Sequence, residues 1–491
     1  MPKKGIPSKA AYQLLHDETA LDGNPLLNLA SFVHTWMPEE ANQLILENMN
    51  KNIVDLEEYP AAGIIHNRCV SMIANLWRAQ KGEKATGTAT AGSSEAILLG
   101  GLAMKKRWQE ARKAAGKDYF HPNIVFGANA QVALEKFARY FDVECRLVPV
   151  KAEKGFIMDP HDALQYIDEN TIGVMVILGS TYTGHFENVQ LMSNLLDDLQ
   201  RRTGLDIPIH VDAASGGFVA PFAYPHLKWS FDVKRVVSIN TSGHKFGLVY
   251  AGIGWILWRD ESYLHKDLIF ELHYLGSVEY TYTLNFSKPA APVIAQMYNF
   301  LNLGFEGYKA IAVKDLRNSR MLSRALENSY FTVLSNIHTP LASKSVLGRG
   351  LGEEDSDDPQ NYEPGLPVVA FRLSDEFKKE NPQVQQRWIQ VMLKTKGWIV
   401  PNYEAPEGAS DVEILRVVVR ETLTEDLVER FIVDLFEITE SLRGAEGTLM
   451  ATVSSQVLHQ PDQDHGRPDK NNFTDAGKEG GAKQSGFSRQ C

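Results

Sequence analysis

Residues 238–247 place a lysine in surroundings that suit covalent chemistry. Lys245 follows an apolar, strand-like run over residues 235–239, and its neighbours are His244, glycine and serine instead of other charges. The turn after a strand is where open α/β sheets bind ligands. A lysine amine forms a Schiff base when burial or a nearby cation, such as His244, lowers its pKa. A surface lysine after a strand is the alternative interpretation of this stretch taken alone.

A second stretch, residues 86–96, predicts a binding site for an anion. Small and hydroxyl-bearing residues, including Ser93 and Ser94, precede a helical pattern over residues 97–115. The free N–H groups and the positive dipole end of a helix bind phosphate. The stretch has neither the ending of a P-loop nor a GxGxxG pattern. The two serines could equally be plain N-caps of the helix.

A third candidate, Asp212, follows an apolar run over residues 207–211. Pyridoxal phosphate requires a lysine for its aldehyde, an anion site for its phosphate and a carboxylate at its ring nitrogen. Lys245, the Ser93-Ser94 helix start and Asp212 are of these three types. A carboxylate keeps the ring nitrogen protonated through a charge-assisted hydrogen bond. The sequence therefore predicts a pyridoxal phosphate site.

The elements around these residues follow an α/β pattern. Strands are predicted at residues 123–127, 144–150, 172–178, 207–211 and 235–239, with helices at 131–141 and 189–202 between them. Strands that alternate with helices at this spacing predict a mainly parallel sheet. The run at 252–258 is predicted to pair antiparallel, because no crossover helix fits between it and the strand before Lys245.

The chain divides into four predicted parts. Residues 1–60 form an N-terminal arm that packs on a partner subunit, and residues 61–330 form the large domain. Residues 331–446 form a smaller C-terminal α/β domain, with strands at 368–373, 399–403 and 412–419 and helices at 383–396 and 425–443. Residues 447–491 are polar and predicted to be disordered. Residues 268–289 are predicted to be an irregular lid.

Composition narrows the classes of partner. The net charge of -11 argues against a nucleic-acid partner. No apolar run reaches the length that spans a membrane. The three cysteines have no metal-binding spacing, so no metal site and a reducing compartment, the cytoplasm, are expected. The C-terminal tail lacks a basic amphipathic helix anchored by tryptophan, so calmodulin is not an expected partner.

Eight motifs between residues 28 and 290 carry a family resemblance. They are NLASF (28–32), EEYP (57–60), GSSEA (92–96), EKFARYFDVE (135–144), STYTGH (180–185), HVDAASGGFVAPF (210–222), SGHKFGL (242–248) and LNFSKPA (284–290). The chain resembles the pyridoxal-phosphate-dependent decarboxylases, most closely those acting on glutamate. The resemblance extends over residues 28–420.

The resemblance implies a fold, an assembly and an activity. The fold is the type I, aspartate aminotransferase-like fold of enzymes that use pyridoxal phosphate. The assembly is a homodimer or a higher homo-oligomer, such as a hexamer, with active sites at subunit interfaces. The implied activity is the conversion of L-glutamate to 4-aminobutanoate and CO₂ in the cytoplasm, through an external aldimine and a quinonoid intermediate.

The resemblance also implies residue roles. Lys245 and Asp212 are the catalytic pair, and Tyr274 lies on a loop covering the site, where it or Lys245 returns a proton. Cofactor contacts are implied for Ser93, Ser94, Gln131, Thr181, Ala214, Ser242, His244 and, from the adjacent subunit, Ser287. Substrate contacts are implied for Arg416, which binds a carboxylate, and for Ser31, Phe32 and His66, which lie near the distal carboxylate.

Two positions depart from the family pattern. Glu135 stands where some members have a histidine that stacks on the cofactor ring, and an acidic side chain cannot stack in that way. His66 stands where some members have an aspartate near the distal carboxylate. A histidine at this position can hydrogen-bond the carboxylate or serve only the core.

Three other functions remain open at the level of sequence. Aspartate or cysteine sulfinate is an alternative substrate, because the lysine, aspartate and phosphate site do not depend on the length of the substrate side chain. An aminotransferase would return the proton to the cofactor and yield a keto acid. A catalytically silent scaffold is disfavoured, because Lys245, Asp212, Ser93 and Ser94 are all present.

Overall fold

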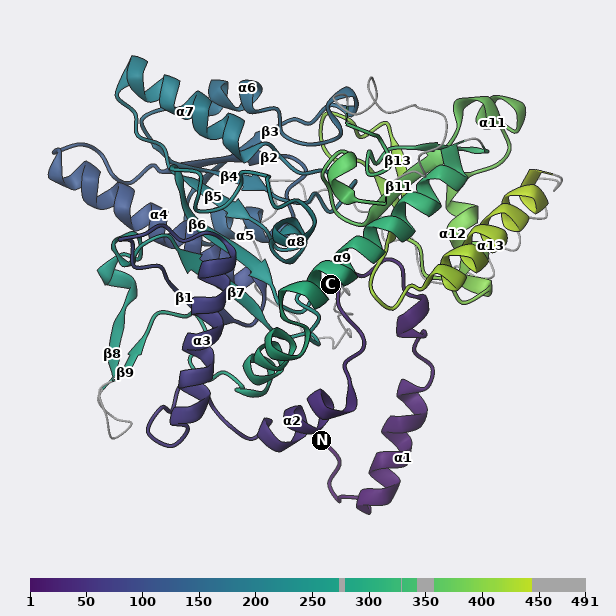
Figure 1. Ribbon diagram of the computed structural model, residues 1–491, viewed down its shortest axis with the longest axis horizontal. Coiled ribbons are helices and arrows are strands. Elements are labelled where there is room, and N and C mark those ends of the chain that lie inside the picture. Colours follow the sequence, from purple (N-terminus) through teal and green to yellow (C-terminus); the bar gives the residue numbers. More distant parts are fainter. Residues whose placement is uncertain (273–278, 328, 342–356, 444–491) are drawn as a thin grey trace, which may run out of the picture.

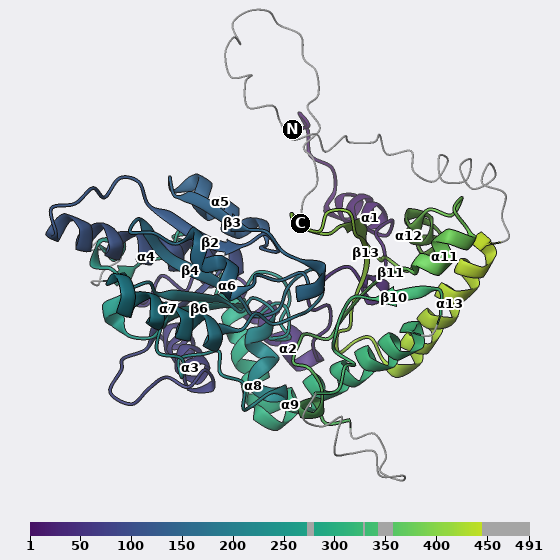
Figure 2. The same ribbon diagram turned by 90° about the horizontal axis from the view of Figure 1, so that it is seen from above.

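The chain builds two units, each around its own β-sheet, and the long helix α9 (Ala291–Glu327) runs between them (Figure 1). The structure is a computed structural model that describes residues 1–272, 279–327, 329–341 and 357–443. Seen from above, the units lie side by side (Figure 2). Within α9, Gly304 has a φ of 57°, a backbone conformation that glycine adopts without strain. Two helical segments therefore meet at this residue.

The larger unit contains a seven-stranded sheet with the order β1-β7-β6-β5-β4-β2-β3. Its strands are β1 (Thr86–Thr90), β2 (Asn123–Gly127), β3 (Glu144–Val148), β4 (Thr171–Ile177), β5 (Ile209–Asp212), β6 (Val236–Ser242) and β7 (Gly254–Trp258). Neighbouring strands from β3 to β6 pair parallel, and β7 pairs antiparallel with β6. The mainly parallel sheet and the antiparallel pairing of β7 are thus confirmed.

Strand β1 was not expected, because residues 86–96 were interpreted only as small, hydroxyl-bearing residues at the start of a helix. Thr86–Thr90 pairs antiparallel with β7, so that Thr86 lies opposite Trp258 and Thr90 opposite Gly254. This partner is remote in the sequence, and the small residues of β1 carry no strand pattern of their own. Tertiary pairing decides the conformation here.

Helices cover both faces of the sheet, and β7 shows why. Alternate side chains of a strand point to opposite faces. Ile256 and Trp258 pack with apolar residues of α4 (Ser93–Ala114), whereas Trp255 and Leu257 belong to the core that contains Ile73 of α3 (Pro60–Leu76). An all-apolar strand buried on both faces reads as a continuous hydrophobic run, as it does here.

Shorter elements complete this unit. Its other helices include α5 (Val132–Tyr140), α6 (Pro160–Ala163), α7 (Val189–Thr203) and α8 (Ala220–Ala223). The stretch predicted to be irregular, residues 268–289, contains two short paired strands, β8 (Phe270–Leu272) and β9 (Glu279–Thr281). Tyr274, predicted to cover the site, lies outside the described residues.

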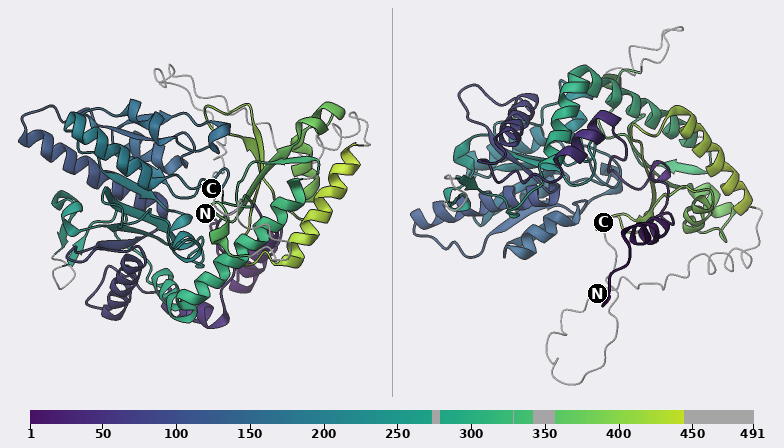
Figure 3. Two further views of the ribbon diagram at one scale, coloured as in Figure 1. Left: turned by 45° about the horizontal axis from the view of Figure 1, so that its top comes forward. Right: turned by 90° about the horizontal axis from the view of Figure 1, so that it is seen from below.

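The smaller unit has an antiparallel sheet with the order β10-β11-β13-β12. Its elements are β10 (Phe331–Val333), β11 (Val368–Leu373), α11 (Asp375–Glu380), α12 (Gln386–Thr395), β12 (Asn402–Glu404), β13 (Glu413–Val418) and α13 (Glu425–Arg443). Figure 3 shows α13 beside α9 on the outer side. The strand predicted at 399–403 begins later, because the backbone of Ile399 bonds to Leu27 and Leu29 instead of to the sheet.

The N-terminal segment packs on its own chain over part of its length. Leu29 is fully buried in the core of the smaller unit, and α2 (Glu39–Asn48) packs on α9. Helix α1 (Ser8–Thr19), in contrast, has no buried residue. Among the described residues, no helix is both long and apolar enough to cross a bilayer.

Candidate active site

A cavity of about 430 Å³, here called the Lys245 cavity, opens at the carboxyl ends of β4, β5 and β6. Its walls contain all of the predicted cofactor residues except Ser287. The lining residues are Ala91, Gly92, Ser93, Ser94, Glu95, Ile97, Asn129, Gln131, Ile177, Gly179, Thr181, Asp212, Ala214, Ser215, Ser242, His244 and Lys245. Parallel strands bring residues that are distant in sequence to one edge of the sheet.

Lys245 lies on the turn directly after β6, with its amine inside this cavity. Its Nζ donates a hydrogen bond to Ser215 Oγ at 3.3 Å. Burial lowers the pKa of the Lys245 amine; Asp212 opposes this effect and the charge of Arg416 adds to it. A lowered pKa makes the neutral, nucleophilic amine available.

His244 is not the cation that the sequence suggested beside Lys245. Burial, with the neighbouring charge of Lys245, lowers the pKa of His244 to about 4, so the ring is neutral at neutral pH. Its Nδ1 accepts a hydrogen bond from the backbone N–H of Ile253 at 3.3 Å. The other ring nitrogen, Nε2, therefore carries the proton and is available to donate.

The start of α4 forms one wall of the cavity. Ser93 and Ser242 join there through their hydroxyl oxygens, which are 2.7 Å apart. Within the described ranges of the chain, no side chain caps the N-terminus of α4 after Gly92. A Cβ atom at Gly254 of β7 would lie 2.4 Å from the carbonyl carbon of Gly92, so only glycine lets the strand approach this turn. The first turn of α4 therefore presents backbone N–H groups and two serines to the cavity.

Glu95, on the same helix turn, has a structural task that its sequence position did not reveal. Its carboxylate accepts hydrogen bonds from the backbone N–H groups of Ala91 at 2.8 Å, Leu284 at 3.0 Å and Asn285 at 3.2 Å. It thereby holds residues 284–285 against the start of α4.

Asp212 ends β5 and is almost fully buried at the cavity wall. Its Oδ1 accepts hydrogen bonds from the backbone N–H of Ala214 at 3.1 Å and from Asn240 Nδ2 at 2.9 Å. Sequence reasoning missed Asn240. The signal was available, because Asn240 precedes Ser242 by two positions on one strand and therefore shares its face.

Arg416 reaches the large unit from β13 of the smaller one. Its Nη1 donates to the Thr181 carbonyl at 2.8 Å and its Nη2 to the Ala30 carbonyl at 2.5 Å. Its buried Nε has no partner within the described residues. The ring of Phe32 lies near both basic side chains: its centroid is 4.9 Å from Arg416 Cζ and 5.3 Å from Lys245 Nζ.

Two predicted residues, His66 and Ser287, lie apart from this group, whereas Ser31 lies between Ala30, which Arg416 bonds, and Phe32. His66 lines a separate cavity of about 560 Å³ that also contains Lys288. The His66 Nε2 accepts the backbone N–H of Ala89 at 2.9 Å, and burial lowers the pKa of this ring to about 4. Ser287 is exposed, and Ser31 Oγ accepts the backbone N–H of Val33 at 3.1 Å. Within one copy of the chain, His66 therefore does not reach the Lys245 cavity.

Two further predicted positions can be placed. Gln131 caps α5, where its side-chain oxygen accepts the N–H of Ala133 at 2.7 Å. Glu135 is exposed on the same helix.

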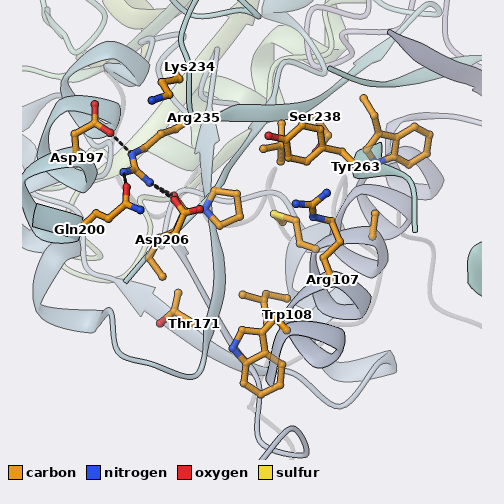
Figure 4. A pocket seen from close by; sticks show the side chains of 18 residues that line it. Arg107, Trp108, Thr171, Asp197, Gln200, Asp206, Lys234, Arg235, Ser238 and Tyr263 are labelled. Carbon is orange, nitrogen blue, oxygen red and sulfur yellow. Dashed lines mark hydrogen bonds and ion pairs between the residues drawn. The ribbon is translucent and has the colours of Figure 1, made fainter. Parts of the chain in front are cut away.

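Another cavity, of about 420 Å³, lies at the amino ends of β4, β5 and β6, opposite the Lys245 cavity (Figure 4). Here it is called the Arg235 cavity. Arg235 is held by Asp197 at 2.6 Å and Asp206 at 2.9 Å, so its charge is already compensated. Of the predicted catalytic and cofactor residues that the structure describes, none lines this cavity.

Comparison with known proteins identifies the family. The model of the pyridoxal-dependent decarboxylase conserved domain matches residues 2–344. The chain belongs to the pyridoxal-dependent decarboxylase family. Its cofactor is pyridoxal phosphate. The type I fold, with a mainly parallel sheet and a smaller C-terminal unit, is thereby confirmed.

Relatives in this decarboxylase family include glutamate decarboxylases. One from Saccharomyces cerevisiae is 48% identical and covers 90% of this chain and 79% of its own. One from Solanum lycopersicum is 48% identical, with 90% and 82% covered. The solved glutamate decarboxylase of Lactobacillus brevis has a TM-score of 0.82 at 38% identity, covering 91% of this chain and 95% of its own.

The residues of the Lys245 cavity fit the cofactor of this family. The uncapped start of α4, two serines and the donating His244 suit a phosphate. A Cβ atom at Gly92 would lie only 3.1 Å from His244 Cε1, so glycine keeps this space open. A buried amine and a buried carboxylate complete the set.

Proposed function

We propose that this chain decarboxylates L-glutamate to 4-aminobutanoate and CO₂ at the Lys245 cavity. The observation that carries the proposal is the convergence of Lys245, Asp212 and the α4 start in one cavity, with Arg416 and Phe32 beside the amine. Glutamate as substrate is supported by relatives named glutamate decarboxylase that are 48% identical over most of the chain.

Each cofactor contact follows from a donor or acceptor in the cavity. Ser93, Ser94, Ser242 and His244 hold the phosphate together with the N–H groups of α4. Asp212 would pair with the ring nitrogen, and Thr181, Ala214 and Gln131, which also line the cavity, would lie beside the ring. Lys245 supplies the amine that bonds the aldehyde carbon. When bound, pyridoxal phosphate supplies the electron sink for the bond that breaks.

The proposed substrate contacts are Arg416, Phe32 and the backbone near Ser31. Arg416 binds one carboxylate of glutamate, since its buried Nε has no partner among the residues that the structure describes and its other nitrogens are already fixed by carbonyls. The ring of Phe32 and the backbone near Ser31 form the wall that faces the substrate side chain. Lys245 Nζ returns a proton to Cα, which replaces the lost carboxylate, so each turnover takes up one proton.

A second copy of the chain completes each site in this proposal. Ser287 and His66 lie outside the Lys245 cavity of their own chain, and both are assigned to the partner's site. Tyr274 is assigned to the cover of the site. Helix α1 supports a homodimer or a higher homo-oligomer, because its side chains Tyr12, Leu14 and Leu15 are more than half exposed. An exposed apolar helix face is a candidate subunit contact.

Shared sites can be tested by mixing defective subunits. Lys245→Ala and Ser287→Ala variants are each expected to be impaired alone. Co-expressed, they form mixed dimers in which one of the two sites has both native residues, and activity is partly restored. Mixed dimers as inactive as Lys245→Ala alone would contradict the shared site.

The proposed location of the enzyme is the cytoplasm, supported by the free thiols of Cys69 and Cys145 and tested by cell fractionation.

The activity itself is tested with the purified protein and its Lys245→Ala variant. Pyridoxal phosphate is added, the visible spectrum is recorded, and 4-aminobutanoate and CO₂ are assayed after addition of L-glutamate. A Schiff-base band and glutamate-dependent product, both lost in Lys245→Ala, are expected. A band without product from glutamate would indicate that the substrate is aspartate or cysteine sulfinate instead. A keto acid in place of CO₂ would indicate an aminotransferase, and no band would overturn the cofactor site.

A further inference from the structure

A line of three side-chain hydrogen bonds crosses β5 and β6 and ends at Asp212. Ser238 Oγ lies 2.7 Å from His210 Nδ1, His210 Nε2 lies 2.7 Å from Asn240 Oδ1, and Asn240 Nδ2 lies 2.9 Å from Asp212 Oδ1. Ser238, His210 and Asn240 are fully buried, and Asp212 nearly so. Strand pairing explains the line, since His210 lies opposite Ser238 and Asp212 opposite Asn240 on one face of the sheet.

The chemistry of Asp212 determines the direction of every bond in this line. A carboxylate only accepts, so Asn240 turns its amide NH₂ toward Asp212 and its carbonyl oxygen toward His210. His210 must then donate from Nε2. Burial lowers the pKa of His210, so the ring is neutral and its Nδ1 accepts from the Ser238 hydroxyl. All three donors therefore point toward Asp212.

The line leaves one oxygen of Asp212 for another partner. Oδ1 accepts both Asn240 Nδ2 and the backbone N–H of Ala214. Within the described residues, Oδ2 accepts no hydrogen bond, although Asp212 lines the Lys245 cavity. Two donors on one oxygen fix the plane of the carboxylate, because both must be satisfied together. The free oxygen is then held in one direction.

Helix α4 provides the space for this line. A Cβ atom at Gly100 would lie 2.6 Å from the His210 ring, so the ring rests directly against the helix. The same helix begins at the proposed phosphate site. The far end of the line, Ser238, lies in the wall of the Arg235 cavity at the opposite edge of the sheet (Figure 4). The hydrogen bonds thus run beneath α4, from the amino ends of the central strands to their carboxyl ends.

We propose that Asn240, held by His210 and Ser238, is a positioning residue that orients Asp212 toward the ring nitrogen of pyridoxal phosphate. The inference rests on the proposed function, because it requires the cofactor in the Lys245 cavity. It assigns a role to three buried residues that are not among those lining the Lys245 cavity.

The test compares two ligands that differ only at the ring nitrogen. Pyridoxal phosphate and its 1-deaza analogue, in which a C–H group replaces that nitrogen, are titrated into the wild-type protein and into Asn240→Leu. For pyridoxal phosphate we expect the dissociation constant to rise about tenfold in the variant, the scale of one hydrogen bond to a charged group. For the analogue we expect no change. Equal weakening for both ligands would indicate general damage and overturn the inference.

A conservative replacement separates hydrogen bonding from packing. Gln at position 210 can donate from its amide nitrogen and accept at its amide oxygen, whereas Leu can do neither. His210→Gln is therefore expected to bind pyridoxal phosphate more tightly than His210→Leu, with both variants equal toward the analogue. No difference between the two variants toward pyridoxal phosphate would overturn the inference.

Two more variants control for the possibility that a substitution prevents folding. Ser238→Ala removes a single hydroxyl at the far end, and we expect about a threefold weaker affinity for pyridoxal phosphate alone, the scale of a neutral hydrogen bond. Thr171→Val breaks another buried bond of the same sheet, from Thr171 Oγ1 to Asn123 Oδ1 at 2.7 Å, and should change neither affinity. A wild-type protein that does not bind pyridoxal phosphate would overturn the proposed function, whereas equal losses for both ligands overturn only the positioning role.

Discussion

Replacing Arg416 with lysine is expected to impair glutamate recognition beyond any effect on folding. Arg416 donates from two nitrogens to the carbonyls of Thr181 and Ala30, and its Nε has no partner in the described part of the chain. A lysine keeps the charge, but its single ammonium group cannot satisfy two carbonyls and a carboxylate in one fixed geometry. The substrate carboxylate therefore loses its oriented partner in Arg416→Lys.

The expected loss can be worked from one interaction. A hydrogen bond to a charged group contributes about 1.5–3 kcal/mol. Loss of that contact lowers kcat/KM for L-glutamate by about 10- to 100-fold, since each 1.4 kcal/mol corresponds to about a factor of ten. The assay is steady-state formation of 4-aminobutanoate at saturating pyridoxal phosphate, with thermal unfolding measured on the same samples.

Arg420→Lys is the matched control. Arg420 is also buried, and it also anchors the N-terminal segment, donating from Nη2 to the Asn28 carbonyl at 2.8 Å and the Pro25 carbonyl at 3.1 Å. Its hydrogen bonds go to the N-terminal segment, whereas Arg416 also bonds the carbonyl of Thr181, which lines the Lys245 cavity. Both variants should lower the melting temperature, but only Arg416→Lys should change kcat/KM strongly. Equal kinetic losses in the two variants would refute a role of Arg416 in binding substrate.

Three further predictions concern acid stability, the phosphate site and the segment before Ser287. Burial lowers the pKa of His185 to about 4, below the 6.5 of the unfolded chain, so its protonation favours unfolding as the pH falls between these values. The free energy of unfolding therefore decreases between pH 7 and pH 4, and in His185→Gln this decrease should be smaller by about 3 kcal/mol. Urea denaturation at the two pH values measures it. Gly254→Ala should weaken pyridoxal phosphate binding at least ~10-fold, because its Cβ would collide with Gly92; unchanged affinity in a titration would contradict the proposed phosphate site. Glu95→Gln should speed hydrogen exchange at the backbone amides of Leu284 and Asn285, because the Glu95 carboxylate accepts hydrogen bonds from both. Unchanged exchange would show that this contact does not restrain the segment.

The sequence alone determined the βα units and the places where they end in polar residues. Apolar runs such as that of β6 stop at small polar residues, and this change is local in the chain. Lys245 and Asp212 could therefore be assigned to the carboxyl ends of strands in a parallel sheet before any contact was known. The antiparallel return of β7 also followed from the sequence, because the connection is too short for a crossover.

Only the tertiary structure decided which remote residues join that edge. β1 forms because β7 pairs with it, Arg416 arrives from the smaller sheet, and His66 turns to the backbone of Ala89 instead of to the Lys245 cavity. The orientation of Asp212 through Asn240 likewise depends on the register between β5 and β6. These choices rest on packing between segments far apart in the chain, and no local pattern of residue types records them.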